Sequence, residues 1–480
     1  MRESHRVYNG RVIPAFVESD SAGSTPPHSA MSSSSPATPT PTGAGDFGLP
    51  SERDQRRNAL LYASQISITY FAAPALYIGF MQASLCKRLE TSDTVANLPS
   101  TVFLSMAWTT VVIAWLFPQA RLLKRLLSAA YLLMAGAGLL VAGVLVAQPG
   151  TTAIVTALVI HGALVGISVP LIGVLGWEVL DRGVSRKLRG RALGMAFGVG
   201  PAFAVLGSLS AQLFMNGKLS HFNLPDALAP VYPYSYALLF TISAACTLIA
   251  AWLTVLYRIP IPAHEPPRQS FQEGIVGGFR AVLGYPILLI ACIAYLLMYS
   301  GNMVQINMSI FTQEAVGQMA ENLAGYQLTL RFTFKILAGF FLGWLLARTN
   351  PKAPLLVTAG LLMLGVLWVM FVPGYWFLLA FGINGAGELF GVYYVNYPAQ
   401  CSPRSQVRRN ISVLMLISAF VGLAPVGYGF ISDNWGLRAS FVAALVLLIA
   451  TTAMVFLKLP WRPQPRPQDM TEADRAALGS

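Results

Sequence analysis

The chain has 480 residues, of which 55% are apolar and only 11% are charged. Roughly a quarter of the residues of an average soluble domain are charged, so this composition excludes an ordinary soluble protein. The formal net charge of +12 would also suit a nucleic-acid-binding protein, but the placement of the basic residues gives it a different meaning, as shown below.

The first 57 residues differ from the rest of the chain. The stretch SAGSTPPHSAMSSSSPATPTPTGAG is rich in Ser, Thr, Pro and Gly, and such a segment cannot bury enough apolar surface to form a core. We therefore predict that residues 1–57 form a disordered tail.

Apolar runs of about 20 residues, long enough to cross a bilayer, recur from residue 58 onward. We predict twelve membrane-spanning helices, joined by short turns such as AQPGTT and FVPGYW. Their expected ranges are 58–84, 99–118, 126–147, 152–178, 191–215, 234–257, 286–311, 324–346, 354–372, 375–399, 410–431 and 438–458.

The basic residues test this count through the positive-inside rule. With a cytoplasmic N-terminus, 26 of the 32 Lys and Arg residues fall in inside segments and four fall in outside loops. The remaining two lie within a span. A missed or additional helix would scramble this asymmetry, so the basic excess reports topology. Nucleic acid is not an expected partner.

Residues 258–285 form the longest polar break after the tail and divide six helices from six. We expect an N-terminal bundle at 58–257, a cytoplasmic linker with an amphipathic segment at 258–285, a C-terminal bundle at 286–459 and a cytoplasmic tail at 460–480. WLFPQARLLKRLL and WLLARTNPKAPLL follow the second helix of each half. Such repeats are typical of secondary transporters.

This arrangement resembles the major facilitator superfamily. The resemblance covers residues 58–459 and rests on the two sets of six helices, on the basic loops after helices 2 and 8, and on the motifs LRGRALG (188–194) and GFISDNWGLRASF (429–441). It implies an all-α membrane protein with twelve transmembrane helices in two pseudo-symmetric six-helix bundles. It also implies a central cavity lined by helices 1, 2, 4, 5, 7, 8, 10 and 11.

The loop after helix 2 departs from the family pattern Gly-x-x-x-Asp-Arg-x-Gly-Arg-Arg. Ala120 occupies the position of the Asp in this pattern, and Leu123 occupies the position of its second Gly. The charge network that usually forms the inner gate is therefore in doubt. The residues assigned to inner-gate loops are Arg121, Lys124, Arg125, Asp181, Arg189 and Arg191.

Two cations, Arg331 and Lys335, lie inside the helix 8 segment LTLRFTFKILAGFF. Their i, i+4 spacing places both on one face. At 1.5 Å per residue, Lys335 lies about 18 Å from the inner end, near the midplane, with Arg331 about 6 Å further out. Because ionisable residues inside a membrane mark functional sites by default, we predict that this pair binds an anionic group of a substrate.

Glu388 is the one obvious carboxylate at similar depth, in the glycine-rich helix 10 segment GINGAGELFGVYYVNY. We expect it to pair with Lys335, and it is our candidate for proton coupling. The alternative is that Lys335 and Glu388 form a buried structural pair and that Arg331 extends toward the outer surface.

Other polar residues in the spans are less specific. Asn302 and Gln305 share a face of helix 7, and Gln65 and Tyr70 lie on helix 1; we assign all four to substrate binding, with interhelical hydrogen bonding or packing as the alternative. His161 on helix 4 is a second proton-coupling candidate, although a lone histidine is more often a core residue.

The four cysteines lie far apart and form no metal-ligand spacing, so we expect neither a metal nor another cofactor. The chain shows no metal triad, nucleophile elbow or P-loop, so an enzyme is not expected. We predict a monomer in the bilayer of a bacterial inner membrane, with both termini cytoplasmic and with a small solute, and protons, as partners.

The sequence therefore favours a secondary active transporter of a small polar, anionic organic solute that works by alternating access. Three alternatives stay open. The first is a facilitator or exporter whose intramembrane charges are structural. The others are a transport-inactive membrane sensor or scaffold, and a membrane-embedded enzyme.

Overall fold

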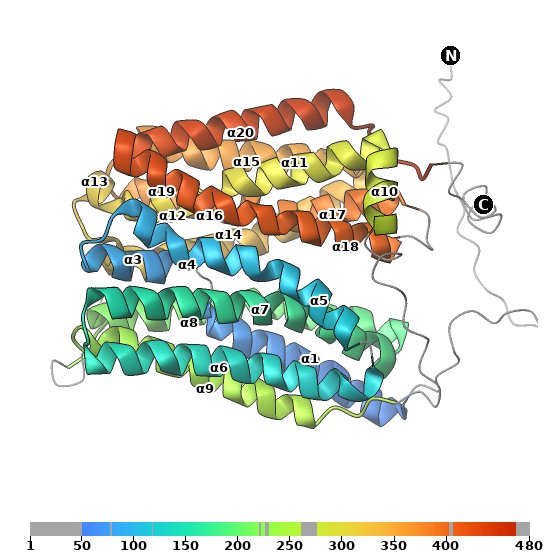
Figure 1. The fold of residues 1–480 in the computed structure, drawn as a ribbon, viewed down its shortest axis with the longest axis horizontal. Helices are drawn as coiled ribbons and strands as arrows, with labels where there is room; N and C mark the ends of the chain where they lie inside the picture. Colours follow the sequence, from blue (N-terminus) through green and yellow to red (C-terminus); the bar gives the residue numbers. More distant parts are fainter. Residues whose placement is uncertain are drawn as a thin grey trace, which may run out of the picture. The chain divides into compact units, whose positions relative to one another are not determined.

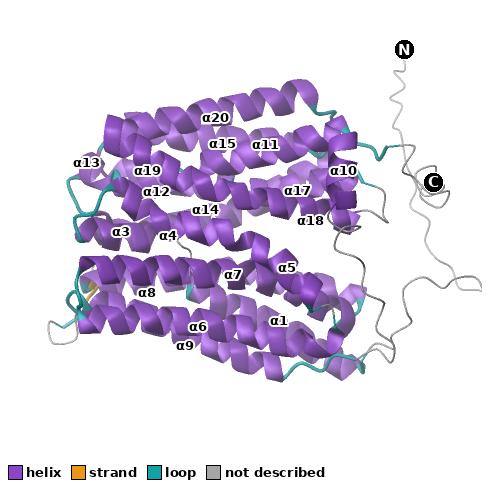
Figure 2. Ribbon diagram, viewed as in Figure 1, coloured by secondary structure: helices purple, strands orange, loops and turns teal. Residues whose placement is uncertain are grey.

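A computed structural model describes residues 50–76, 79–117, 119–219, 222–225, 230–260, 276–402 and 407–466, which belong to one compact unit, Phe47–Ser480. Most of the predicted N-terminal tail, most of the linker and the end of the C-terminal tail lie outside these residues. The described part is almost entirely helical, and its only strands are a short antiparallel pair, β1 (Lys218–Leu219) and β2 (Phe222–Asn223) (Figure 2).

The N-terminal half, residues 50–260, contains nine α-helices. They are α1 (Glu52–Phe71), α2 (Ala73–Leu76), α3 (Phe80–Arg88), α4 (Asp93–Ser105), α5 (Thr109–Leu116), α6 (Leu123–Ala147), α7 (Thr151–Gly183), α8 (Arg186–Asn216) and α9 (Tyr234–Val255). The C-terminal half, residues 276–466, contains α10 (Gly277–Gly284), α11 (Pro286–Asn302), α12 (Gln305–Ile310), α13 (Thr312–Val316), α14 (Ala320–Arg348), α15 (Lys352–Phe371), α16 (Leu379–Gly387), α17 (Phe390–Gln400), α18 (Val407–Ser418), α19 (Leu423–Trp435) and α20 (Leu437–Lys458).

The long helices run side by side along one direction, with α6 to α9 on one side and α11 to α20 on the other (Figure 1). Across the boundary, α8 packs on α14 and α4 packs on α19. Among the described residues, eleven helical stretches are long and apolar enough to cross a membrane. The first expected span is absent from the eleven: α1 has 20 residues but begins with the charged segment ERDQRR, and α2 and α3 are short.

Several expected spans are interrupted rather than continuous, and three of the breaks bear on the site described below. Besides the first, the seventh span breaks between α11 and α12 at Met303 and Val304, and the tenth breaks between α16 and α17 at Glu388 and Leu389. At the last break the Leu389 amide donates to the Ala386 carbonyl, three residues earlier, at 3.4 Å. The helix therefore narrows to a 3-10 turn in a segment rich in glycine. Membrane helices tolerate such breaks where neighbouring helices bury the freed backbone groups.

The hydrogen bonds that join described residues of the two halves gather at one end of the bundle, which the positive-inside rule predicts to be the outer end. Asp433, at the end of α19, accepts from the Asp93 amide at 2.7 Å, the Thr94 amide at 3.0 Å and the Thr94 hydroxyl at 2.5 Å. A carboxylate there caps the N-terminus of α4.

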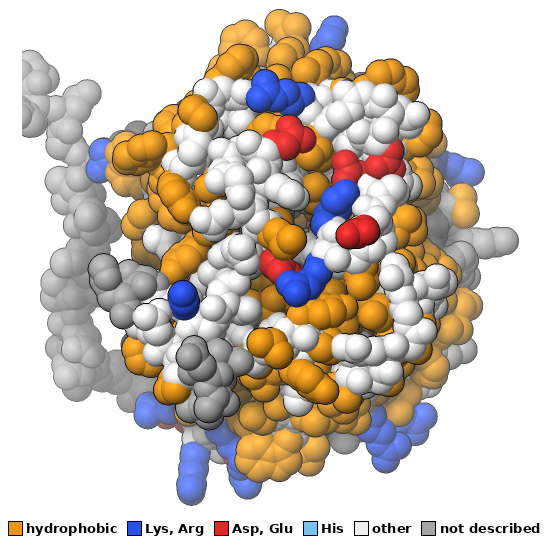
Figure 3. Space-filling model, turned by 90° about the vertical axis from the view of Figure 1, so that its left-hand side faces the viewer, with side chains coloured by type: hydrophobic (Ala, Val, Ile, Leu, Met, Phe, Trp, Pro, Cys, Tyr) orange, Lys and Arg blue, Asp and Glu red, His pale blue; other side chains and the backbone are white. Residues whose placement is uncertain are grey.

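A second contact between the halves lies at the same end. Glu321 of α14 pairs with Arg88 of α3 and accepts from the Tyr236 hydroxyl of α9 at 2.9 Å. Acidic and basic side chains are accordingly interspersed on this face (Figure 3). These contacts close the cavity described next at its outer end.

Candidate binding site

A cavity of about 470 Å³ lies between the two halves, which is within the usual range for small-molecule sites. Side chains from α1, α3, α4, α7 and α8 line it on one side, and side chains from α11, α12, α14 and α17 line it on the other. The three helix breaks reach it through Gly79, Met303 and Glu388. Gly79, which has a φ of +148° that suits glycine, caps the start of α3.

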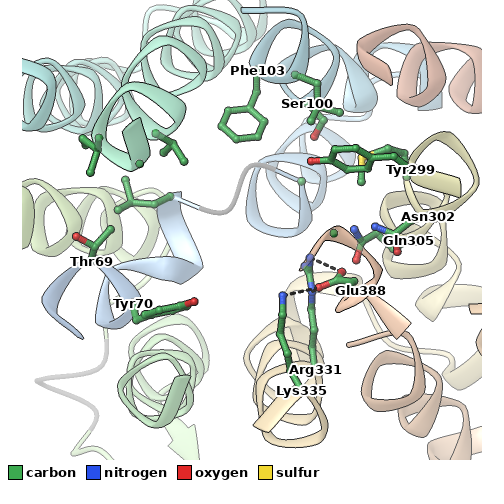
Figure 4. A pocket seen from close by; sticks show the side chains of 18 of the residues that line it. Thr69, Tyr70, Ser100, Phe103, Tyr299, Asn302, Gln305, Arg331, Lys335 and Glu388 are labelled. Atoms are coloured by element: carbon green, nitrogen blue, oxygen red, sulfur yellow. Dashed lines mark hydrogen bonds and ion pairs between the residues drawn. The ribbon is translucent and has the colours of Figure 1, made fainter. Parts of the chain in front are cut away.

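The centre of the site is a buried cluster of three charges (Figure 4). Arg331 binds Glu388 through two contacts, Nη2 to Oε1 at 2.5 Å and Nε to Oε2 at 3.0 Å. Lys335 Nζ donates to the same Oε2 at 3.2 Å. Only 9%, 21% and 5% of the Arg331, Lys335 and Glu388 side chains is exposed, so the cluster holds one positive charge in excess in a poorly solvated place.

Helix packing explains why these charges meet. The i, i+4 spacing on α14 places both cations on one face, and α16 approaches that face closely. A Cβ on Gly385 would lie 2.2 Å from the backbone oxygen of Arg331, so only glycine fits at this crossing. The end of α16 therefore lies against α14, and Glu388 follows it directly.

The cluster differs from the expected pairing in one respect. The sequence predicted that Lys335 pairs with Glu388 and that both cations bind the anionic group of a substrate, whereas Arg331 makes a two-pronged contact with Glu388 and Lys335 makes a single one. The planar guanidinium fork matches a carboxylate better than an ammonium does. Arg331 also lies beneath the Phe80 ring of α3, with its Cζ 5.0 Å from the ring centroid.

Besides the two cations, the sequence assigned four polar residues to substrate binding. Three of them line the cavity: Asn302, Gln305 and Tyr70. The Tyr70 ring lies across the open space from Arg331 and Lys335 (Figure 4) and packs edge-on against Phe332, with the centroids 6.2 Å apart.

Gln65 and His161 depart from their expected roles, because neither lies among the cavity-lining residues. Gln65 faces α9: its Nε2 donates to the Ala250 carbonyl and to Thr254 Oγ1, both at 2.7 Å, and its Oε1 accepts from the Tyr257 hydroxyl at 2.5 Å. This amide is fully used within its own half. His161 is buried against the Phe240 ring, at 5.2 Å between centroids, and neither of its ring nitrogens has a hydrogen-bond partner among the described residues.

The assigned inner-gate residues lie at the opposite end from Asp433 and contact their own half. Lys124 donates to the Tyr257 carbonyl at 2.9 Å, and Arg189 pairs with Asp181 at 2.8 Å. Arg121, Arg125 and Arg191 are exposed at the ends of α6 and α8.

Sequence reasoning missed the residues that join the halves at the outer end. Asp433 stands in the motif GFISDNWGLRASF, which carried the family resemblance, but no role was assigned to it. Glu321 and Arg88 were assigned no role either. The position of Asp433 inside that motif was the one available signal. Among the described residues, no three His, Cys, Asp or Glu side chains lie close enough to hold a metal ion.

Comparison with known proteins gives the same fold. A model of the Major Facilitator Superfamily matches residues 296–478, and no curated protein matches the chain by sequence. The crystal structure of the nucleoside transporter NupG is similar with a TM-score of 0.60 and 12% identity, over 84% of this chain and 100% of that one.

Two sugar transporters are similar as well. The E. coli fucose:proton symporter FucP, in a variant form, has a TM-score of 0.53 and 15% identity over 85% of this chain and 98% of its own. A D-xylose-proton symporter has a TM-score of 0.60 and 14% identity over 84% of this chain and 98% of its own. Likeness at these identities concerns the fold alone.

Proposed function

We propose that the chain is a multi-pass membrane transporter of the major facilitator superfamily, which the family match over residues 296–478 and the shared fold support, and that it carries an anionic organic solute by secondary active transport. The observation that supports the anion is the excess of positive charge in the cavity. Two cations meet one carboxylate, and no other Asp, Glu, Lys or Arg lies among the described residues that line it.

Electrostatics favours an anion over a neutral solute or a cation. Taking a charge out of water costs several kcal/mol per ion unless it is paired, so the uncompensated charge is best stabilised by a monoanion. Lys335 is the first contact for the anion, because it makes the longest of the three contacts, 3.2 Å, and is the most exposed member, at 21%. The incoming carboxylate binds Lys335 and then shares the Arg331 guanidinium, which has five N–H donors, with Glu388.

Glu388 then has a role in coupling. A bound anion next to Glu388 adds a second negative charge to the cluster, and like charges favour protonation of one of them. In this scheme a proton joins Glu388 as the anion binds and leaves it when the anion leaves. Alternating exposure of the cavity by rocking of the two halves then carries both across the membrane.

Substitution of Arg331 by Lys tests the anion site. Lys keeps the charge but loses the planar fork. The loss of a charge-assisted contact costs about 1.5–3 kcal/mol, a roughly tenfold to more than a hundredfold weaker affinity. A thermal-shift panel of organic acids, sugars and peptides on the purified protein identifies binders, whose affinity is then measured in each variant.

The matched control is Arg348→Lys, the same change at the exposed end of the same helix, where Arg348 lies over the Trp344 ring at 5.2 Å. Its affinity should stay at the wild-type value. If only sugars or peptides bind, or if Arg331→Lys binds acids as well as the wild type does, the anion proposal is wrong.

A second candidate function is a facilitator or exporter in which the three charges are structural. The two-pronged contact between Arg331 and Glu388 favours it, since that arrangement gives the buried carboxylate a cationic partner without a ligand. An imposed pH gradient separates the two functions: a change in the transport rate supports proton coupling, and an unchanged rate supports the facilitator.

A further inference from the structure

The cavity contains a second polar group besides the three charges. Ser100 of α4, Asn302 of α11 and Gln305 of α12 line it and are only 2%, 5% and 7% exposed. The Ser100 Oγ, Asn302 Oδ1 and Gln305 Oε1 atoms have no hydrogen-bond partner among the described residues. We call these three residues the neutral subsite (Figure 4).

Unpaired polar atoms are costly in such a place. A buried donor or acceptor without a partner costs about 1–3 kcal/mol, and native proteins pair most of them. Some buried amides are fully paired: Gln212 donates to the Asn322 carbonyl at 2.6 Å and accepts from the Gly325 amide at 3.0 Å. Others, such as Asn97 and Asn410, also have an oxygen without a partner among the described residues. What distinguishes the neutral subsite is that three such atoms line one cavity.

The chemistry of the neutral subsite indicates its ligand group. An amide both donates and accepts hydrogen bonds, and a serine hydroxyl does the same, so a hydroxyl group is a complementary ligand. An ammonium group is a poorer one, because the nearby cluster already holds an excess positive charge and its only carboxylate, Glu388, is occupied by Arg331.

The remaining surface of the cavity is largely aromatic. Its aromatic lining residues are Tyr70, Phe80, Phe103 and Tyr299. The Tyr70 and Phe103 rings lie across the cavity from the three charges (Figure 4). Aromatic side chains pack best against another ring or an apolar body. A small aliphatic acid would cover less of the exposed faces of these rings than a ligand with an aromatic ring would.

From these three features we infer that the transported anion is a hydroxylated aromatic monocarboxylate. The inference rests on the proposed anion transport. Its carboxylate binds Lys335, its hydroxyl binds the neutral subsite, and its ring packs against the aromatic side chains. The sequence favoured a small polar, anionic solute in general; the inference restricts this class to solutes that also contain an aromatic ring.

Equilibrium binding to the purified full-length protein tests the inference. The probes are benzoate, the three hydroxybenzoate isomers and cyclohexanecarboxylate. One hydrogen bond contributes about 0.5–1.5 kcal/mol, so at least one hydroxybenzoate should bind roughly two- to tenfold more tightly than benzoate. Benzoate should in turn bind more tightly than cyclohexanecarboxylate.

The Asn302→Leu/Gln305→Met double variant should abolish the preference for the hydroxyl group. It keeps the size of both side chains, so benzoate affinity should stay unchanged and also reports that the variant is folded. The matched control, Asn434→Leu, changes an exposed amide at the outer end and should keep the preference.

The outcomes separate this inference from the proposed function. Carboxylates that bind without any preference for a hydroxyl or a ring overturn the inference alone. A double variant that weakens benzoate as much as hydroxybenzoate overturns it too, because the amides would then act on the fold. Failure of every carboxylate to bind overturns the anion proposal and the inference with it.

Discussion

Replacement of Glu388 by Gln removes one negative charge from the buried cluster and changes its net charge from +1 to +2. Glu388 is 5% exposed and makes three contacts with Arg331 and Lys335, at 2.5, 3.0 and 3.2 Å. Gln has nearly the same size, so the change acts on charge and leaves the packing almost intact.

The magnitude follows from breaking a buried ion pair. Removal of one partner leaves the other charge uncompensated and typically costs 3–5 kcal/mol. We expect the unliganded Glu388→Gln variant to lose stability by about this amount, and a bound anion to restore more stability than it adds to the wild type. If Glu388 carries the coupled proton, the variant should also lose uphill accumulation yet keep counterflow exchange, which needs no net proton movement.

Thermal unfolding with and without a bound acid, and the two transport assays in proteoliposomes, measure these effects. The control is Glu52→Gln, which removes an exposed pair with Arg56 at 2.6 Å where both side chains are at least 70% exposed. It should change stability by no more than about 1 kcal/mol. A Glu388→Gln variant with wild-type stability, or one that still accumulates solute against a gradient, would refute the reasoning.

Three further predictions concern other parts of the molecule. Asp433→Asn should weaken the closure at the outer end, so that a cysteine at Phe103 is alkylated faster from outside; an unchanged rate would mean that Asp433 does not hold the halves together. On a cysteine-free background, Gln269→Cys should resist impermeant reagents added outside and Asn434→Cys should react, and the reverse pattern would overturn the predicted topology. Gln65→Leu should lower stability by about 1–3 kcal/mol without changing ligand affinity. A loss of affinity without a loss of stability would mean that Gln65 contacts the ligand after all.

The overall architecture was predictable because hydropathy and charge asymmetry act on long stretches of chain. A span needs about 20 apolar residues, and this condition identified eleven of the helices by composition alone. The three charges of the cluster were also found from the sequence, since ionisable residues inside spans are rare and stand out.

Other features depend on packing that no local pattern encodes. Which face of α1 points at the cavity is set by its neighbours, so Gln65 and Tyr70 looked equivalent although only Tyr70 reaches the cavity. The pairing of Arg331 with Glu388 depends on the close approach of Gly385. The contact between Asp433 and Asp93 joins residues 340 positions apart, and a single sequence gives no sign of it.

The placement of all three charges in one half has an electrical consequence. Arg331, Lys335 and Glu388 lie on two helices in backbone contact at Gly385, so they move as one unit when the halves rock. The empty site then carries +1 through the change of access, and the site with a monoanion but without the coupled proton is neutral.

A membrane potential acts on the first state and not on the second, with about 2.3 kcal/mol per elementary charge for each 100 mV that the charge crosses. With the predicted topology, an inside-negative potential holds the empty transporter with its cavity open to the cytoplasm. Voltage therefore sets the rate at which the empty carrier returns outward. A carrier loaded with the anion alone crosses without sensing the voltage, whereas one that also holds the coupled proton keeps the charge of +1 and is driven inward by it.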